Sequence, residues 1–235
     1  VQSLVGSEMC IRDRCMLESY KTKLVLFDLD GTLIDTAPDF LISLNNVLAK
    51  HGKEKIGLAQ IRPHISEGSS KMIKFFFQID YDHKNFEMYK NEFLSEYKLN
   101  LIKNSKLFNG MINVIEFLDN NSIMYGIVTN KFHEYAEPIV ESFSELKNIK
   151  ILICPDHVSV SKPDPEGIIL ACKKLNIKAA ETIYLGDHLN DLKAGISAET
   201  RVIGCLYGYS LDQNIISTVG CPYVNSASEI ISFID

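Results

Sequence analysis

The chain has 235 residues, of which 24 are basic and 30 acidic, so its formal net charge is −6. Hydrophobic residues make up 46% and charged residues 23%, a composition typical of globular proteins rather than of disordered chains. The mild acidity gives no electrostatic reason to expect nucleic acid or an anionic membrane as a partner. No apolar run approaches the ~18 residues of a membrane-spanning helix, which excludes that class.

The cysteines and the first twenty residues bear on the cellular compartment. The six cysteines form no C-x-x-C pair and have no histidines at zinc-ligand spacing, and residues 1–20 lack the apolar segment of a secretory signal. We therefore expect a reducing, cytoplasmic location. The stretch SLVGSEMCIRDR resembles translated adapter in proteins from assembled environmental DNA. We expect residues 1–20 to be a non-native or disordered leader with Met16 as the natural start, the alternative being a frayed native terminus.

The first predicted element is a short buried strand at 24–27, where four apolar residues follow one another. A helix is expected to start in the stretch TAPD, because Thr36 can cap it and Asp39 completes a T-x-x-D box. Apolar residues then repeat at helical spacing as far as a stop at Gly52. Two further amphipathic helices are predicted, around 72–76 and 86–97. Residues 37–106 are therefore expected to be entirely helical.

Beyond residue 107 the hydrophobic pattern alternates between strands and helices. Strands are predicted at 123–128, 151–154, 182–185 and 201–205. Helices are predicted at about 112–118 and 132–145, from near 165, through Gly195 and after Ser228. Such alternation predicts a parallel sheet covered on both faces. The fold class is thus α/β, with a Rossmann-like core formed by 21–36 and 107–235 and interrupted after its first strand by the helical insert.

The strongest chemical signal is the stretch DLDG at 28–31, directly after the first strand. Strand alternation places Asp28 and Asp30 on one side, and Gly31 allows the backbone to approach a ligand. Two carboxylates this close repel one another unless a cation such as Mg²⁺ lies between them. One carboxylate can then act as a nucleophile while its neighbour transfers protons. Taken alone, the stretch is also compatible with a turn rich in Asp and Gly.

Two other strand ends, at Thr129 and Asp187, supply polar side chains at the edge where ligands bind in open parallel sheets. Asp187 can complete an oxygen shell for Mg²⁺ and Asp191 can orient it, or Asp187 only caps the next helix. The hydroxyl of Thr129 can bind a phosphate oxygen or cap a helix. Lys162 precedes a proline, which holds it extended, and its ammonium can neutralise phosphate and carboxylates. A solvated surface lysine is the alternative at that position.

Four stretches, FDLDGTL, VTNK, SKPDP and GDHLND, resemble in order and spacing the four motifs of the haloacid dehalogenase superfamily. The resemblance covers nearly the whole chain from residue 23 and includes a helical cap at 37–106. It implies a Mg²⁺-dependent phosphatase with Asp28 as the nucleophile that forms an aspartyl-phosphate and Asp30 as the acid and base. Mg²⁺ would be held by Asp28, the backbone carbonyl of Asp30, and Asp187. Asp191 and Asn190 would support the metal. The phosphoryl group would be bound by Gly31, Thr129, Asn130 and Lys162.

The motif variants narrow the family further. Transport ATPases of the superfamily carry Thr at the position of Asp30 and dehalogenases lack an acid there, so Asp30 favours a phosphatase or a phosphomutase. DGTLIDTAPDF is similar to the phosphoglycolate phosphatase group, and IRPHISEGSS, CPDHVSVSKPDP and YLGDHLND resemble the N-acetylmuramic acid 6-phosphate phosphatases within it. Two residues depart from that pattern. Glu199 stands where Gly is usual, and Asn109 stands where Pro is usual.

The resemblance places substrate recognition in the cap, where Arg62, Ser66 and Ser69 are the candidates. Arg62 can pair with a substrate carboxylate, which phosphoglycolate and muramic acid phosphate both carry, or it is a surface arginine. The expected substrate is a small phosphorylated metabolite, either N-acetylmuramic acid 6-phosphate or 2-phosphoglycolate, with no nucleic acid or membrane partner. A sugar phosphomutase and a non-catalytic phosphate-binding regulatory protein are the alternatives. The expected assembly is a monomer or a homodimer.

Overall fold

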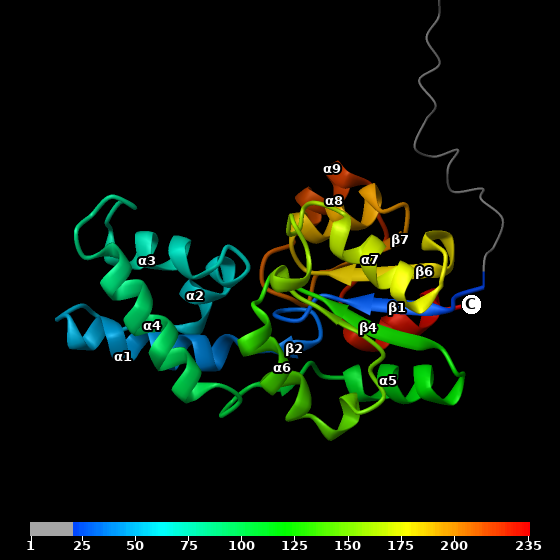
Figure 1. Cartoon of the computed structure of the whole chain (residues 1–235), viewed down its shortest axis with the longest axis horizontal. Coiled ribbons are helices and arrows are strands. Elements are labelled where there is room, and N and C mark those ends of the chain that lie inside the picture. Colours follow the sequence, from blue (N-terminus) through cyan, green and yellow to red (C-terminus); the bar gives the residue numbers. More distant parts are fainter. Residues whose placement is uncertain (1–20) are drawn as a thin grey trace, which may run out of the picture.

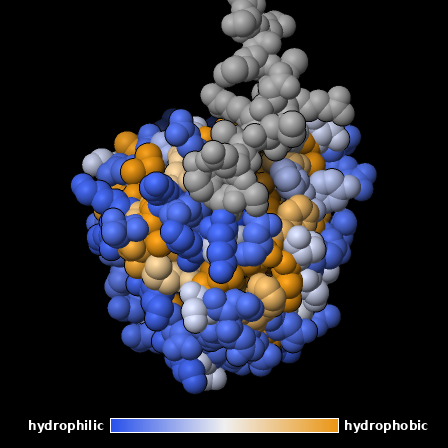
Figure 2. All heavy atoms as spheres, turned by 90° about the vertical axis from the view of Figure 1, so that its right-hand side faces the viewer, coloured by the Kyte–Doolittle hydropathy of each residue, from blue (hydrophilic) through white to orange (hydrophobic). Residues whose placement is uncertain are grey.

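The computed structural model describes residues 21–235, so the predicted leader and the start at Met16 lie outside the described residues. Figure 1 shows a central sheet with helices on both faces and a separate group of four helices to one side. On the face of the molecule in Figure 2, hydrophilic side chains cover most of the surface around scattered hydrophobic ones. Within the described residues, every helix is too short or too polar to span a membrane.

The sheet has six parallel strands in the order β5-β4-β1-β6-β7-β8. The central strand β1 is buried throughout and pairs with β4 on one side and β6 on the other. This burial explains its unbroken apolar sequence, because helices cover both of its faces. The parallel sheet predicted from the sequence is confirmed. The strands are β1 Leu24–Phe27, β4 Met124–Val128, β5 Leu152–Ile153, β6 Thr182–Gly186, β7 Arg201–Cys205 and β8 Tyr223–Val224.

Alternate residues of β1 enter two different hydrophobic cores. Val25 and Phe27 pack with α5, whereas Leu24 and Leu26 pack with α7 and α8. The predicted helix at 132–145 stops early at Glu141, and the predicted last helix is a 3₁₀ helix at Ala227–Phe233. The α-helices around the sheet are α5 Met111–Asn120, α6 His133–Glu141, α7 Glu166–Leu175, α8 Leu189–Ser197 and α9 Gln213–Val219.

The four remaining helices surround a hydrophobic core of their own, which includes Phe40, Leu44, Phe93 and Tyr97. Their grouping away from the sheet is visible in Figure 1. The helix that carries Arg62 contains a proline at its sixth position, so the sequence pattern did not predict it. The helices are α1 Ala37–Lys50, α2 Leu58–Ile65, α3 Ser69–Phe77 and α4 Phe86–Asn100.

The chain passes from the sheet to these helices and back through two adjacent segments. β2 (Ile34–Asp35) and β3 (Lys106–Leu107) form a two-stranded antiparallel sheet at the crossing. α1 begins directly after Thr36, as predicted, but within the described residues the Thr36 side chain makes no capping hydrogen bond. Asp39 instead accepts hydrogen bonds from the backbone N–H groups of Asn104 and Ser105, at 2.8 and 3.1 Å. A long-range contact between α1 and the segment just before β3 therefore takes the place of the local helix cap.

Candidate active site

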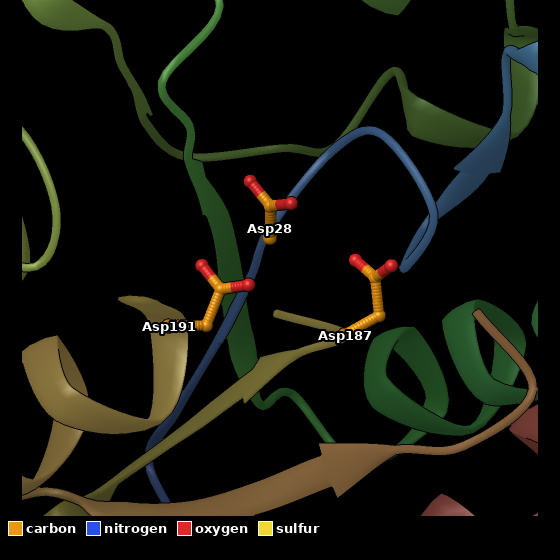
Figure 3. A group of neighbouring side chains, drawn as sticks. All are labelled: Asp28, Asp187 and Asp191. Carbon is orange, nitrogen blue, oxygen red and sulfur yellow. The ribbon is translucent and has the colours of Figure 1, made fainter. Parts of the chain in front are cut away.

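Three carboxylates meet at the carboxyl ends of the central strands. Asp28 follows β1, Asp187 follows β6, and Asp191 lies in the first turn of α8. Because β1 and β6 are parallel neighbours, their carboxyl ends lie at the same edge of the sheet. One oxygen from each carboxylate lies within 4.8 Å of the other two, and Figure 3 shows the side chains converging. All three residues are buried, with Asp187 wholly inaccessible.

A single buried ammonium group lies against two of these carboxylates. Lys162 Nζ lies 2.7 Å from Asp28 Oδ1 and 2.6 Å from Asp191 Oδ1. The hydroxyl of Tyr184, in β6, completes the contact at 2.9 Å from Nζ and 3.1 Å from Asp191 Oδ1. The alternative that Lys162 is a solvated surface lysine is therefore excluded, since the residue is only 7% exposed.

The backbone of Lys162 is held by Asn130, a residue expected to bind phosphate. Asn130 Nδ2 donates to the carbonyl oxygen of Lys162 at 2.9 Å, and its Oδ1 accepts from the N–H of Lys162 at 3.1 Å. Both ends of the side-chain amide are thus engaged with another residue of the chain. In this arrangement Asn130 fixes the loop that carries Lys162, and among the described residues its side chain makes no hydrogen bond to the buried carboxylates.

The buried carboxylates of this site carry more negative charge than the ammonium of Lys162 can neutralise. Burial raises the pKa of the Asp28 carboxyl to about 7, with Lys162 lowering it and Asp191 raising it further. Burial and the charges of Asp28 and Asp191 raise the pKa of Asp187 well above its ordinary value. Burial lowers the pKa of Lys162, but the two carboxylates outweigh it and raise the pKa overall. One ammonium thus faces three buried carboxylates, and this all-oxygen donor set fits a hard divalent cation.

Asp187 is fixed by the segments on either side of it. Its Oδ1 accepts a hydrogen bond from the hydroxyl of Thr32 at 3.1 Å, and its Oδ2 accepts from the N–H of Tyr209 at 2.8 Å. Gly31 has a φ of +90°, and a Cβ there would lie 2.4 Å from Asp187 Oδ2. A Cβ at Gly208 would lie 2.3 Å from the Cβ of Asp187. Only glycine fits at either position beside this carboxylate.

The side chain of Asp30 turns away from the three carboxylates. Its Oδ1 accepts from the hydroxyl of Thr36 at 2.5 Å, and Lys131 Nζ donates to Oδ1 at 2.8 Å and to Oδ2 at 2.9 Å. From the residues alone, the Asp28 and Asp30 carboxylates were expected to lie together around one cation, but the Asp30 carboxylate pairs with Lys131 instead. The resemblance assigned only its backbone carbonyl to the metal, so the side chain is available for another task. Thr129 is buried at the end of β4, where its Oγ1 accepts from the N–H of Lys131 at 3.1 Å.

The candidate residues of the insert lie at its junction with the sheet. Arg62 donates from Nη2 to Asp35 Oδ2 at 2.8 Å, and its guanidinium lies 5.7 Å from the centre of the Tyr209 ring. Arg62 Nε and Ser66 Oγ are buried and have no hydrogen-bond partner among the described residues. Ser69 is the first residue of α3. No hydrogen bond among residues 21–235 joins these three side chains to the buried carboxylates.

His188 and Asn190 meet through a local helix cap. The backbone N–H of Asn190, the residue before Asp191, donates to His188 Nδ1 at 3.1 Å. Burial lowers the pKa of His188, which favours the neutral ring that this hydrogen bond requires. Within residues 21–235 the Asn190 side chain forms no hydrogen bond with the carboxylates.

Four residues of this region were not predicted from the sequence: Lys131, Tyr184, Gly208 and Tyr209. Lys131 and Tyr184 stood within the quoted motifs. A motif shows that residues belong to a site, but it does not show that a side chain contacts the buried carboxylates or Asp30. Gly208 and Tyr209 lie outside all of the motifs described above.

Comparison with known proteins identifies the class. The family model of haloacid dehalogenase-like hydrolases matches residues 25–205. An N-acetylmuramic acid 6-phosphate phosphatase from Pseudomonas putida is 41% identical over 189 residues, which cover 80% of this chain and 85% of the relative. A phosphoglycolate phosphatase from Xanthomonas campestris is 35% identical over 187 residues, which cover 80% of this chain and 84% of the relative.

Solved structures share the fold at low sequence identity. A predicted phosphoglycolate phosphatase from Haemophilus somnus matches with a TM-score of 0.82 at 23% identity, covering 93% of this chain and 100% of that chain. A haloacid dehalogenase-like hydrolase from Streptococcus pneumoniae matches with a TM-score of 0.78 at 18% identity, covering 91% and 99%. At these identities the likeness concerns the fold alone.

The chain belongs to the haloacid dehalogenase-like hydrolases, as its four motifs predicted. Its curated relatives within that family are phosphatases. The expected class of phosphoric monoester hydrolase is therefore confirmed.

Proposed function

We propose that the chain is a Mg²⁺-dependent phosphatase that hydrolyses a small phosphorylated metabolite through an aspartyl-phosphate at Asp28. The observation that carries the proposal is that the carboxylates have different positions and different partners. Asp28 lies with Asp187 and Asp191 against the ammonium of Lys162, whereas Asp30 lies apart against Lys131. A nucleophile among oxygen ligands suited to a cation, and a separate proton carrier, are what two-step phosphoryl transfer requires.

The reaction uses two carboxylates of this chain in sequence. In the first step an oxygen of Asp28 attacks phosphorus, and the bond from phosphorus to the leaving oxygen breaks. The electron pair of that bond stays on the leaving oxygen, which takes a proton from Asp30. In the second step water attacks phosphorus and gives a proton to Asp30, while the electron pair of the breaking bond returns to the Asp28 carboxylate.

The remaining residues neutralise and orient these groups. Asp28, Asp187 and the backbone carbonyl of Asp30 would hold Mg²⁺, with Asp191 in support. When bound, Mg²⁺ supplies positive charge against the phosphoryl oxygens and the buried carboxylates. Lys162 keeps Asp28 in place and offers its ammonium to the same oxygens, and Thr129 adds a hydroxyl. Asn130 acts through Lys162 by holding its backbone.

For the substrate we propose N-acetylmuramic acid 6-phosphate, with 2-phosphoglycolate as a weaker substrate. Relatives of this chain carry both names, and the N-acetylmuramic acid 6-phosphate phosphatase has the higher identity of the two quoted above. We assign substrate recognition to residues 37–106 acting as a cap, where Arg62 Nε and Ser66 Oγ are buried polar atoms without partners among the described residues. A sugar phosphate offers more remote contacts than a two-carbon acid for aligning phosphorus with Asp28.

The test measures phosphate release from both substrates and from a neutral sugar phosphate, with Mg²⁺ present. We expect the highest kcat/KM for N-acetylmuramic acid 6-phosphate. Asp28→Asn removes the nucleophilic charge and should lower turnover at least about a thousandfold, whereas Asp119→Asn, at an exposed carboxylate of α5, should leave it unchanged. Near-normal turnover by Asp28→Asn contradicts the aspartyl-phosphate mechanism. Isomerised sugar phosphate without phosphate release identifies a phosphomutase instead.

A further inference from the structure

We propose that Lys131 is a positioning residue for the acid–base step, holding the Asp30 carboxylate in place by both of its oxygens. The proposal rests on the function assigned above, because it takes Asp30 as the proton carrier. Lys131 Nζ lies 2.8 Å from Asp30 Oδ1 and 2.9 Å from Oδ2. Thr36 donates to the same Oδ1 at 2.5 Å, so Asp30 is held on two sides.

The ammonium of Lys131 is itself fixed by two parts of the molecule. Its side chain is only 6% exposed, and a charge this deeply buried is strongly unfavourable unless it is paired. Asp30 supplies the pairing carboxylate. Nζ also lies 4.5 Å from the centre of the Phe40 ring and 4.8 Å from that of Tyr97, a cation–π geometry on both. The rings belong to α1 and α4, while the backbone N–H of Lys131 is held by Thr129.

These contacts connect the proton carrier to the helical insert. Phe40 and Tyr97 stack on one another with ring centres 4.1 Å apart, within the core that α1 and α4 share. Any movement of these helices relative to the sheet therefore alters the surroundings of the Lys131 ammonium, and through it the orientation of Asp30. The two lysines of the site have separate partners: Lys162 contacts the nucleophile, and Lys131 contacts the acid and base.

The role of Asp30 in the first step depends on the leaving group, so substrates with different leaving groups can test the role of Lys131. An alkoxide leaving oxygen needs a proton from Asp30 when its bond to phosphorus breaks, whereas nitrophenolate keeps the electron pair and leaves without a proton. The second step is common to both substrates, because in each case Asp30 takes a proton from the attacking water. A misplaced Asp30 thus slows both steps for a sugar phosphate but only the second for p-nitrophenyl phosphate.

The experiment is rapid mixing of the Lys131→Met variant with p-nitrophenyl phosphate and Mg²⁺. Methionine keeps an unbranched side chain beneath the two rings and removes the charge. We expect a burst of about one nitrophenolate per active site, followed by turnover about 10- to 100-fold slower than in the wild type. Turnover of the sugar phosphate should fall at least as far, without a burst of released alcohol. Lys131→Arg should restore part of the rate, and Lys174→Met, at an exposed lysine of α7, should behave as wild type.

Other outcomes overturn the proposal. Turnover within about twofold of wild type excludes a role for Lys131 in the acid–base step. A raised KM with unchanged kcat and no burst assigns the ammonium to substrate binding instead. Lys131→Gln, whose side chain is one atom shorter and uncharged, serves where the methionine variant does not fold, with the same burst expected. Failure of the proposed function is distinguishable, because then the wild type itself releases no phosphate or Asp28→Asn is fully active.

Discussion

At the scale of single residues, Glu199 occupies a backbone conformation that suits glycine. α8 ends at Ser197, and Glu199 follows with a φ of +60°. Its N–H bonds back to the carbonyl of Ile196 at 3.0 Å, and that of Thr200 bonds to Gly195 at 3.1 Å, which closes the helix. The resemblance placed a usual glycine at this position, and the structure supplies the physical reason. A side chain in the left-handed region costs about 1–2 kcal/mol.

Glu199→Gly should therefore stabilise the protein. We expect the free energy of unfolding to rise by about 0.5–1 kcal/mol, because glycine's greater freedom in the unfolded chain offsets part of the relieved strain. Urea denaturation followed by circular dichroism measures the change. Glu116→Gly is the matched control, since it makes the same substitution inside α5, and it should lower the free energy of unfolding by about 1 kcal/mol. A loss of stability in both variants would show that Glu199 is not strained.

Residues of the candidate site differed in how far the sequence could predict them. Asp28 and Asp187 were placed correctly because each directly follows a strand, and the ends of parallel strands meet. Lys131 sits in a quoted motif but contacts Asp30, which is 101 positions away in the sequence. Tyr209 contacts Asp187 through its backbone N–H, a group that every residue except proline possesses. Such contacts depend on the folded arrangement and leave no signal in local sequence.

At the scale of secondary-structure elements, the crossing between sheet and insert gathers several side chains at β2. The hydroxyl of Tyr209 donates to Asp35 Oδ1 at 2.6 Å and accepts from the N–H of Ala37 at 3.0 Å. Arg62 reaches the same carboxylate from α2. Because Tyr209 also holds Asp187, a short path of contacts joins the carboxylate site to the first helix of the insert.

Short elements explain most of what the sequence missed at this scale. β2, β3 and β8 contain two residues each, too few to show alternation. The long apolar strands β1, β4, β6 and β7 were predicted because burial on both faces gives an unbroken apolar run. The predicted capping box at Thr36 does not form because the Thr36 hydroxyl donates to Asp30 instead. Local sequence rules for helix caps do not include such a contact.

Arg62 provides a prediction that separates two roles for α2. If its buried Nε also receives a substrate carboxylate, Arg62→Ala should lower kcat/KM about tenfold more for N-acetylmuramic acid 6-phosphate and 2-phosphoglycolate than for a neutral sugar phosphate. Asp35→Asn is the matched control, because it weakens the same ion pair and leaves Arg62 in place. Equal effects of both variants on all substrates would show that Arg62 only ties the insert to the sheet.

At the scale of the whole molecule, the buried carboxylates make stability depend on pH and on metal. The pKa of Asp28 is raised from 3.8 to about 7 mainly by burial, and that of Asp187 is raised as well. A carboxyl whose pKa is higher in the folded state binds more protons there than in the unfolded chain. Its contribution is therefore fully present below about pH 4 and is lost as the pH rises through about 7.

Mg²⁺ should reverse this loss, so its effect on stability should grow with pH. A cation that binds the folded state alone stabilises it, and it binds more tightly once the carboxylates are ionised. We expect Mg²⁺ to raise Tm by several degrees at about pH 8 and by much less at about pH 5.5. Thermal denaturation at both pH values, with Mg²⁺ and with a chelator, measures the two shifts.

The variant Asp187→Asn supplies the control for this prediction, because it removes one buried charge and one metal-binding oxygen together. It should lose most of the Mg²⁺-dependent rise in Tm at both pH values. Without metal, its Tm should also fall less than that of the wild type between about pH 5.5 and about pH 8, since fewer buried carboxylates ionise. If the wild type gains equally from Mg²⁺ at both pH values, or if the variant gains as much as the wild type, then ionisation of these carboxylates does not govern metal binding.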